Sequence, residues 1–559
     1  MESLSPLQTL PLHVAEKIVS YVATNIRFNS GYDNPNLYLE CCHAVLLPLL
    51  GVCHIFRAAV FLRLSTRCRL LVSEKDAHEV PIPCASCPKR VHHASHLVAK
   101  EVEIWIDPST ACSGKALAAL SCAPFNDILF PLARKLNMHF FDAVDDKEML
   151  DASPDAKANV GAVVQRIRQM APKVDFVKLS GFHGLQHRST NHADELTAQL
   201  VQLGHRIELE SGITGIHYYL KVDDFRDLTY LDCHSGLDGE QITQLVRQNA
   251  PTLQYLSILL KDGFDYSVII KDDDGSYLEY PRLRTLVVKV DHNLRARPKR
   301  DFAGAAPFPI LWRLVCSAVC PFGDDMILFR GNAASLEYLK LILTRELATT
   351  LIRHNVFTPT SYSKLHHVSL RLDINMALDN PADYPEIMQL IEGVAPDAAV
   401  REILSLPFGL LSTPVLPLFG KFANIQVLVL PGLRLSVWDA MTLFNSLPLL
   451  SDFHALSPTL DPLPEGVTKR KLVAHVLSSY SPMALRFRCW HLGTRQDELL
   501  KVSATPFVLL ALACPNFDFV AVDPKRRDML TRALEKTIGV ATYKRYVPRL
   551  RRLLPHGLE

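Results

Sequence analysis

An aliphatic phrase of the form L-x-x-L-x-L recurs along this chain, and its spacing restricts the fold more than any other feature. Copies that keep the spacing, with Val, Ile or Cys also accepted, begin at Leu228, Leu253, Leu283, Leu311, Leu336 and Leu365. Their starts lie 25, 30, 28, 25 and 29 residues apart. A single such unit cannot bury its apolar face alone, so units of this period must stack on their neighbours.

Further copies begin at Val174, Ile425 and Phe517, and a degenerate copy at Val400 partly fills the 60 residues between Leu365 and Ile425. This phrase at this period is the sequence signature of leucine-rich repeats, in which each repeat is a strand followed by a helix or turn. Helical periodicity between the phrases, at 195–203, 240–249 and 438–447, agrees with that alternation. We therefore predict an α/β fold, a leucine-rich-repeat solenoid of the ribonuclease-inhibitor type.

Prolines mark the expected boundaries between helices and strands. They occur in Met170-Ala171-Pro172, Asn249-Ala250-Pro251 and Cys514-Pro515-Asn516. Proline ends a helix without preventing the strand that follows. The predicted organisation is a helical module over 1–70, a connector over 71–100, the solenoid over 101–523 and a helical cap over 524–559.

The composition indicates a folded protein without a strong charge. The 559 residues include 60 basic and 58 acidic side chains, a formal net charge of +2, so we expect no general attraction to nucleic acid or membranes. No apolar run is long enough to cross a bilayer, and the N-terminus lacks the features of a secretory signal. The 13 cysteines are scattered, which favours reduced thiols and a cytoplasmic or nuclear location.

Two apolar helices are predicted before residue 70. The first begins at Leu10-Pro11, because proline is tolerated in the first turn of a helix, and the second covers about 44–64. The F-box motif reads L-P-x-E-L-L-x-x-I-L-x-x-L, followed after a loop by a helix with V-C-x-x-[WF]-[RK]. The chain resembles it at 10–22 (LPLHVAEKIVSYV) and 50–57 (LGVCHIFR). It departs from the motif at His13 and Ala15 and in a longer loop.

An F-box followed by leucine-rich repeats is typical of substrate receptors of Skp–cullin–F-box ubiquitin ligases, and the whole chain resembles large F-box-like families of fungi. The resemblance implies a non-catalytic receptor that binds a Skp-type adaptor, and through it a cullin, and presents a protein substrate. The residues that match packing or adaptor-facing positions of the motif are Leu10, Pro11, Val14, Ile18, Val52 and Phe56. The alternative is an interaction scaffold whose N-terminal helices only cap the first repeat.

Motifs of catalysis are absent from the sequence. It contains no G-x-S-x-G, no H-E-x-x-H, no G-x-G-x-x-G after a strand and no phosphate-binding loop, so we expect neither an enzyme nor a bound cofactor. One pattern resembles half of a zinc site, namely the C-x-x-C pair that is followed closely by histidines. Its candidate ligands are Cys84, Cys87, His92 and His96, with Cys68 as another possibility. A proline-rich connector explains the pattern as well, and we expect no stoichiometric zinc.

The residues between the aliphatic positions predict a binding surface. If the aliphatics point into the core, the alternate residues point to the opposite face of the strands. These alternates are Phe176, Lys178, Tyr230, Asp232, His234, Tyr255, Lys289, Arg313, Tyr338, Lys340, His367 and Arg371. The set is basic and aromatic, so it predicts an acidic or phosphorylated protein segment as partner. Ordinary solvated strand residues are the alternative.

Overall fold

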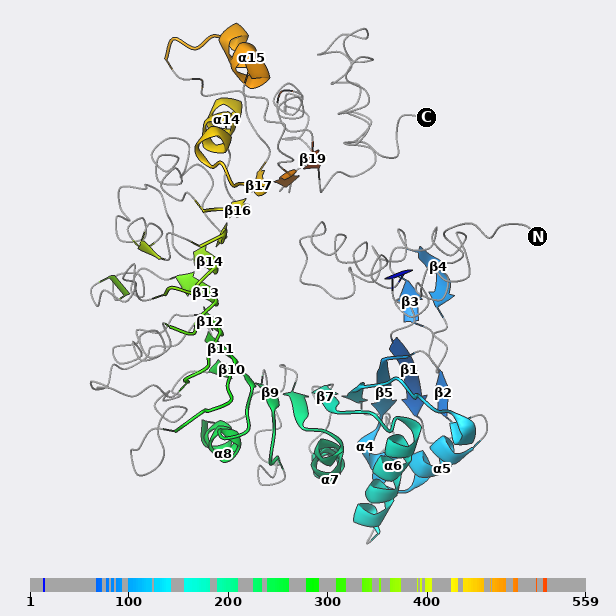
Figure 1. Ribbon diagram of the computed structural model, residues 1–559. Helices are drawn as coiled ribbons and strands as arrows, with labels where there is room; N and C mark the ends of the chain where they lie inside the picture. Colours follow the sequence, from blue (N-terminus) through cyan, green and yellow to red (C-terminus); the bar gives the residue numbers. More distant parts are fainter. Residues whose placement is uncertain are drawn as a thin grey trace, which may run out of the picture. The chain divides into compact units, whose positions relative to one another are not determined.

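The computed structural model describes the strands and many of the helices between them (Figure 1). The described residues are 14–15, 67–72, 77–79, 82–84, 87–92, 99–122, 125–141, 155–180, 189–209, 225–233, 239–260, 278–290, 308–317, 334–343, 351–352, 362–372, 390, 393–394, 398–404, 424–430, 436–456, 463, 465–478, 486–490, 509 and 516–519. Most of the predicted F-box-like module and the predicted cap over 524–559 lie outside them. Among them, no helix is long and apolar enough to span a membrane.

The chain divides into two compact units, with the boundary near residue 283. The N-terminal unit contains a sheet in the order β2-β1-β5-β6-β7-β8-β9-β10, parallel throughout except for the antiparallel edge pair β1–β2. Its strands are β1 (Arg67–Val72), β2 (Ala77–Glu79), β5 (Glu101–Ile106), β6 (Lys135–Phe140), β7 (Phe176–Ser180), β8 (Arg206–Leu209), β9 (Tyr230–Cys233) and β10 (Tyr255–Leu260).

Helices follow several of these strands and lie along one side of the sheet (Figure 1). They are α4 (Pro108–Cys112), α5 (Lys115–Ser121), α6 (Ala156–Met170), α7 (Ser189–Leu200) and α8 (Gly239–Asn249), with 3-10 turns at Phe125–Asp127 and Val201–Leu203. The end of α6 before Pro172 and the end of α8 before Pro251 confirm the proline boundaries.

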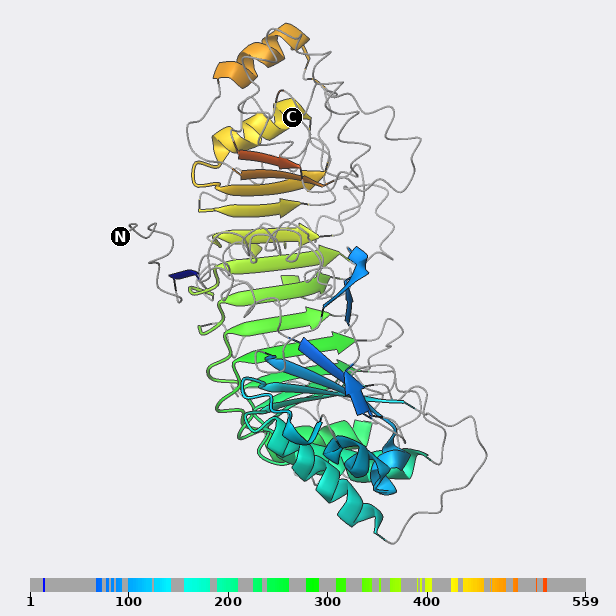
Figure 2. The same ribbon diagram turned by 90° about the vertical axis from the view of Figure 1, so that its right-hand side faces the viewer.

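The C-terminal unit contains an all-parallel sheet in chain order from β11 to β19 (Figure 2). Its strands are β11 (Thr285–Val290), β12 (Arg313–Ser317), β13 (Tyr338–Leu343), β14 (His367–Leu372), β15 (Val400–Leu404), β16 (Val427–Leu430), β17 (Asp452–Leu456), β18 (Arg486–Trp490) and β19 (Asn516–Phe519). Helix α14 (Val437–Ser446) precedes β17, and α15 (Lys469–Ser478) precedes β18.

The recurring aliphatics form the core, as predicted. Leu228, Leu231 and Cys233 are buried, and so are the matching residues of the copies that begin at Leu253, Leu283, Leu311, Leu336, Leu365 and Ile425. The residue before two of the phrases adds a matching hydrogen bond: the hydroxyl of Thr252 donates to the carbonyl of Leu228 at 2.8 Å, and Ser335 donates to Leu311 at 2.8 Å. These two repeats are therefore tied to their predecessors by buried volume and by a hydrogen bond at the strand entrance.

Asn249 joins α8 to the segment before β9. Its side chain accepts a hydrogen bond from the Leu228 amide at 2.9 Å and donates to the carbonyls of Phe225 at 2.6 Å and Leu245 at 2.8 Å. The residue is fully buried, so these bonds satisfy polar groups that would otherwise be costly to bury.

Several strands carry phrases that the aliphatic pattern did not reveal. In β6 the core positions are Ala133, Leu136 and Met138, and before and within β17 they include Leu450 and Phe453, all buried. The interior requires a filled volume rather than leucine, so Ala, Met and Phe serve as well. The aliphatic phrase therefore does not predict β6 and β17, because their core positions include Ala, Met and Phe.

The sheet also begins earlier than the predicted start at Glu101. Strand β1 pairs in parallel with β5, and its Cys68, Leu70 and Val72 are buried in the core. The predicted connector over 71–100 contains β2 and a separate hairpin of β3 (Ile82–Cys84) and β4 (Cys87–His92).

The degenerate copy predicted to begin at Val400 is shifted by two residues from its predicted register. The prediction places Ile403 at the position of Val368 in the preceding copy, whereas in the structure Arg401 aligns with Val368 and Leu428, and Ile403 aligns with Leu370. Arg401 is fully buried, and its Nη2 donates to the carbonyl of Val394 at 2.8 Å. The error arose because a charged residue occupies a position at which the pattern requires an aliphatic one.

Candidate functional site

The alternate face is the face of the strands that carries the residues between the buried aliphatics. In the N-terminal unit the register aligns these residues in rows across the sheet. The first row is Arg67, Glu101, Lys135, Phe176, Arg206, Tyr230 and Tyr255. The second row is Arg69, Glu103, Asn137, Lys178, Glu208, Asp232 and Ser257.

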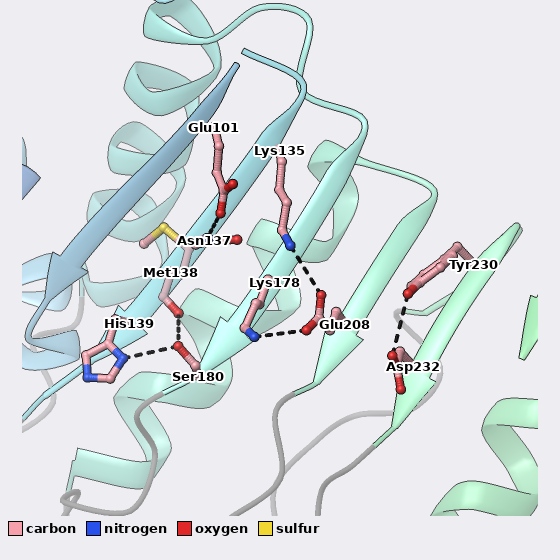
Figure 3. Close-up of polar contacts among 10 residues, drawn as sticks. All are labelled: Glu101, Lys135, Asn137, Met138, His139, Lys178, Ser180, Glu208, Tyr230 and Asp232. Carbon is pink, nitrogen blue, oxygen red and sulfur yellow. Dashed lines mark hydrogen bonds and ion pairs between the residues drawn. The ribbon is translucent and has the colours of Figure 1, made fainter. Parts of the chain in front are cut away.

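Glu208 is the centre of an ion cluster in these rows (Figure 3). Its carboxylate lies 2.9 Å from Nζ of Lys178 and 3.4 Å from Nζ of Lys135. The two lysines come from sequence positions 30 and 73 residues away. Lys178 was predicted to offer a free positive charge to a partner, but here that charge is already compensated.

A second cluster surrounds Glu103. This carboxylate lies 3.1 Å from Nη2 of Arg69 and accepts a hydrogen bond of 2.6 Å from the indole of Trp105. The Trp105 ring packs against His139, with ring centroids 4.1 Å apart. Next to these clusters, the Asn137 amide donates to Glu101.

His139 and Ser180 are in hydrogen-bonding contact, which is the residue pair that a hydrolase uses (Figure 3). Nδ1 of His139 lies 3.1 Å from Oγ of Ser180, and that hydroxyl donates to the carbonyl of Met138 at 3.3 Å. When the hydroxyl proton is directed to Met138, the imidazole donates to Ser180 from its protonated Nδ1. In that tautomer the contact orients the two side chains, because a general base has to accept the hydroxyl proton instead.

Aromatic rings and Arg206 fill the rest of the first row. Tyr230 and Tyr255 are stacked, with centroids 4.1 Å apart and planes 8° apart. The guanidinium of Arg206 lies 5.0 Å from the Phe176 centroid and 5.3 Å from that of Tyr230. Burial, together with the neighbouring Tyr255 and Asp232, raises the pKa of Tyr230, so this ring is neutral at physiological pH.

Among the side chains that the structure describes, the alternate face of the N-terminal unit is therefore balanced in charge. Its cations are Arg69, Lys135, Lys178 and Arg206, its carboxylates are Glu101, Glu103, Glu208 and Asp232, and Arg67 is described in its backbone only. Asp232 is itself buried, at 8% exposure, rather than available at the surface. The predicted basic strip does not extend over this unit, because β5 and β8 contribute acidic residues that the repeat phrase did not reveal.

A signal for β8 was present in the sequence. Val174 and Leu228 begin successive copies of the phrase 54 residues apart, about twice the usual period. A repeat of that period places one more strand between them, and R-I-E-L at 206–209 is a short strand pattern with Glu208 on its alternate face.

The alternate face of the C-terminal unit has a different character. Arg313, Tyr338 and His367 align in its first row, and Lys340 and Ser369 align in its second row. The guanidinium of Arg313 lies 4.8 Å from the Tyr338 centroid, and the Tyr338 and His367 rings are 4.3 Å apart. These predicted residues are thus brought together on adjacent strands. Whether they bind a partner stays a prediction.

Other predicted site residues are only partly described. Val14 is half-buried, whereas Leu10, Pro11, Ile18, Val52, Phe56, His96 and His234 lie outside the described residues, and only the backbone of Lys289 is described.

The candidate zinc ligands Cys84 and Cys87 lie opposite each other in the β3–β4 hairpin, and Ile82 lies opposite His92. Cys87 and His92 are five residues apart in β4, which places their Cα atoms about 16 Å from each other. That separation is large for two ligands of one zinc ion. Cys68, the further candidate, is buried in the core of β1.

These features define the class of the chain. It is an α/β protein with long parallel sheets, consistent with a repeat solenoid, and its two units carry different charge patterns on the alternate face. No family model matches the chain, and no curated protein matches it either.

Proposed function

We propose that this chain is a leucine-rich-repeat receptor that binds a protein partner on the alternate face of its strands. The observation that carries the proposal is the cluster of cations and aromatic rings over β12, β13 and β14, which includes Arg313, Tyr338 and Lys340. Solenoids commonly bind partners on the strand face, because each repeat contributes side chains to one continuous surface.

The ligase role rests on the F-box resemblance at 10–22 and 50–57. In this role the N-terminal helices bind a Skp-type adaptor of a cullin ubiquitin ligase, and the alternate face holds the substrate. The chain then performs no chemistry itself, and its contribution is to position the substrate. Leu10 and Pro11 match the adaptor-facing positions of the motif, so they are the residues to change.

The adaptor interaction is tested by co-purification with the Leu10→Ala, Pro11→Ala double variant. Removal of buried anchor residues from a protein interface costs about 2 kcal/mol or more, so the variant should lose the adaptor. The matched control is Leu129→Ala with Pro131→Ala, because Leu129 is 51% exposed in the N-terminal unit. The control should retain the adaptor. Equal recovery of adaptor by the wild type and the Leu10/Pro11 variant would refute the ligase role.

A second candidate is an interaction scaffold whose N-terminal helices stabilise the fold without binding an adaptor. The observation in its favour is that Ala15, within the F-box-like segment, is fully buried while Val14 is half-buried. Under this alternative the Leu10/Pro11 variant has a lower melting temperature and keeps all its partners. Measuring melting temperature and bound partners on one preparation distinguishes the two candidates.

A further inference from the structure

Three cations in the C-terminal unit form a diagonal line across adjacent strands, which we call the cation diagonal: Arg313, Lys340 and Arg371. Lys340 lies opposite Val315, two residues beyond Arg313, and Arg371 lies opposite Ile342, two residues beyond Lys340. Strand spacing and rise set neighbouring members about 8 Å apart at Cα. Arg313 and Lys340 are half-buried, and Arg371 is exposed.

No described carboxylate forms an ion pair with the cation diagonal. Within the described part of the chain, the ion pairs join Arg69, Lys135 and Lys178 to carboxylates of the N-terminal unit, and none involves the diagonal. The same kind of row position therefore carries Lys178, which is neutralised, in one unit and Lys340, which has no ion pair with a described residue, in the other.

Hydrogen-bonding groups beside the diagonal also lack partners. Ser369 is opposite Lys340 and two residues before Arg371, it is fully buried, and its hydroxyl has no partner among the described residues. Nε of Arg313 is likewise buried without a hydrogen bond, although its guanidinium packs over Tyr338. Native proteins rarely bury such groups unsatisfied, so these donors require an acceptor, which a water molecule or a carboxylate of a partner can supply.

We infer that the cation diagonal binds an extended acidic segment of a protein partner, with carboxylates at alternate positions of the segment. This inference rests on the proposed function and specifies its partner. Side chains on one side of an extended peptide recur about every 6.6 Å, and the Cα atoms of neighbouring cations are about 8 Å apart. The long, flexible Lys and Arg side chains can bridge this difference of about 1.4 Å. A single phosphate instead requires donors that converge on one point.

The Arg313–Tyr338–His367 stack explains how the segment is oriented. The ring of Tyr338 holds the Arg313 guanidinium at 4.8 Å, which fixes the first cation before the partner arrives. Tyr338 and His367 then present an aromatic surface beside the diagonal for uncharged residues of the segment. Charges fix the register, and rings contact the residues between the carboxylates.

The test measures fluorescence anisotropy of a labelled peptide in which Glu alternates with Thr, using the full-length chain. Three further probes are a peptide of the same composition with its Glu residues contiguous, an uncharged peptide with one phosphoserine, and a single-stranded oligonucleotide of equal charge. We expect the alternating peptide to bind most tightly and its affinity to fall as salt is raised. Tighter binding of any other probe, or no binding of the alternating peptide at millimolar concentration, overturns the inference.

Variants locate the binding site. Combining Arg313→Gln, Lys340→Gln and Arg371→Gln should weaken binding of the alternating peptide at least about tenfold. The matched control is Lys178→Gln, whose charge is already neutralised by Glu208, and it should change affinity less than about twofold. If the triple variant does not fold, Arg371→Gln alone changes an exposed residue and should weaken binding about threefold. Unchanged binding by a folded variant, or equal weakening by Lys178→Gln, contradicts the assignment.

The same preparations distinguish this inference from the proposed function. The triple variant leaves residues 10–22 and 50–57 intact, so it should co-purify with adaptor as the wild type does. Adaptor binding without any peptide binding would refute only the acidic segment. Failure of the wild-type chain to co-purify with adaptor would refute the ligase role, whether or not the chain binds the peptide.

Discussion

Arg401 occupies a core position that aliphatic residues occupy in the strands on either side of it. It is fully buried, and burial lowers its pKa to about 10, so the guanidinium still carries its charge at neutral pH. A buried charge is costly unless polar groups surround it, and the carbonyl of Val394 at 2.8 Å is one of its acceptors. This residue shows that position in the repeat, rather than polarity, decides which side chains enter the core.

Two substitutions at this position should have different effects on stability. We expect Arg401→Ala to lower the free energy of unfolding by about 3 kcal/mol, because it leaves a cavity and an unsatisfied carbonyl. Arg401→Met fills most of the same volume and removes a buried charge, so it should stay within about 1 kcal/mol of the wild type. Urea denaturation followed by circular dichroism measures both. An equal loss in the two variants would show that the charge, not the volume, stabilises β15.

At the scale of single elements, α14 shows how local sequence sets a helix start. Ser436 is its N-cap: the Ser436 hydroxyl accepts a hydrogen bond from the Asp439 amide at 3.0 Å and donates to its carboxylate at 2.7 Å. Burial raises the pKa of Asp439, an effect that the hydrogen bonds from Ser436 oppose. The cap therefore satisfies an amide at the helix start and also supports a partly buried acid.

The cap of α14 should contribute measurably to stability. We expect Ser436→Ala to cost about 1 kcal/mol, because it removes the acceptor for the Asp439 amide and a donor to its carboxylate. Thr442→Ala in the same helix is the control, since Thr442 is exposed and its hydroxyl donates only to the Trp438 carbonyl one turn earlier. That change should cost less than about 0.5 kcal/mol in the same denaturation experiment. A larger loss for Thr442→Ala than for Ser436→Ala would contradict the capping role.

At the scale of the whole molecule, the two units differ in how the cations of the alternate face are paired. The N-terminal unit pairs the cations of its alternate face with Glu103 and Glu208, whereas the cation diagonal of the C-terminal unit is unpaired within the described residues. A net charge of +2 therefore conceals a local surface that can attract an anionic partner.

Removing one carboxylate should create a second cationic surface. Glu208→Gln releases Lys178 and Lys135, which lie on adjacent strands, so we expect it to increase the affinity of the N-terminal unit for acidic peptide about two- to threefold. The measurement is peptide anisotropy in a chain that also carries the triple substitution at the cation diagonal, so that only the new surface can respond. If Glu208→Gln does not increase the affinity for acidic peptide in that chain, Glu208 does not prevent the N-terminal unit from binding anions.

The sequence determined the repeat, the parallel strands and the face to which most strand residues belong. These follow from local spacing, because alternation along a strand places Leu339 and Leu341 in the core and Tyr338 and Lys340 opposite. Helices over 240–249 and 438–447 were likewise confirmed within about one residue by α8 and α14. The F-box-like helices stay a prediction.

Only the tertiary structure decided which charges of the alternate face are available. Lys178 and Lys340 are equivalent in sequence terms, since each lies between two core aliphatics of a strand. Their difference arises from Glu208, which is 30 residues from Lys178 and reaches it only because β7 and β8 are neighbours in register. Burial along a strand is a local property, whereas charge compensation depends on residues that stacking brings together from separate repeats.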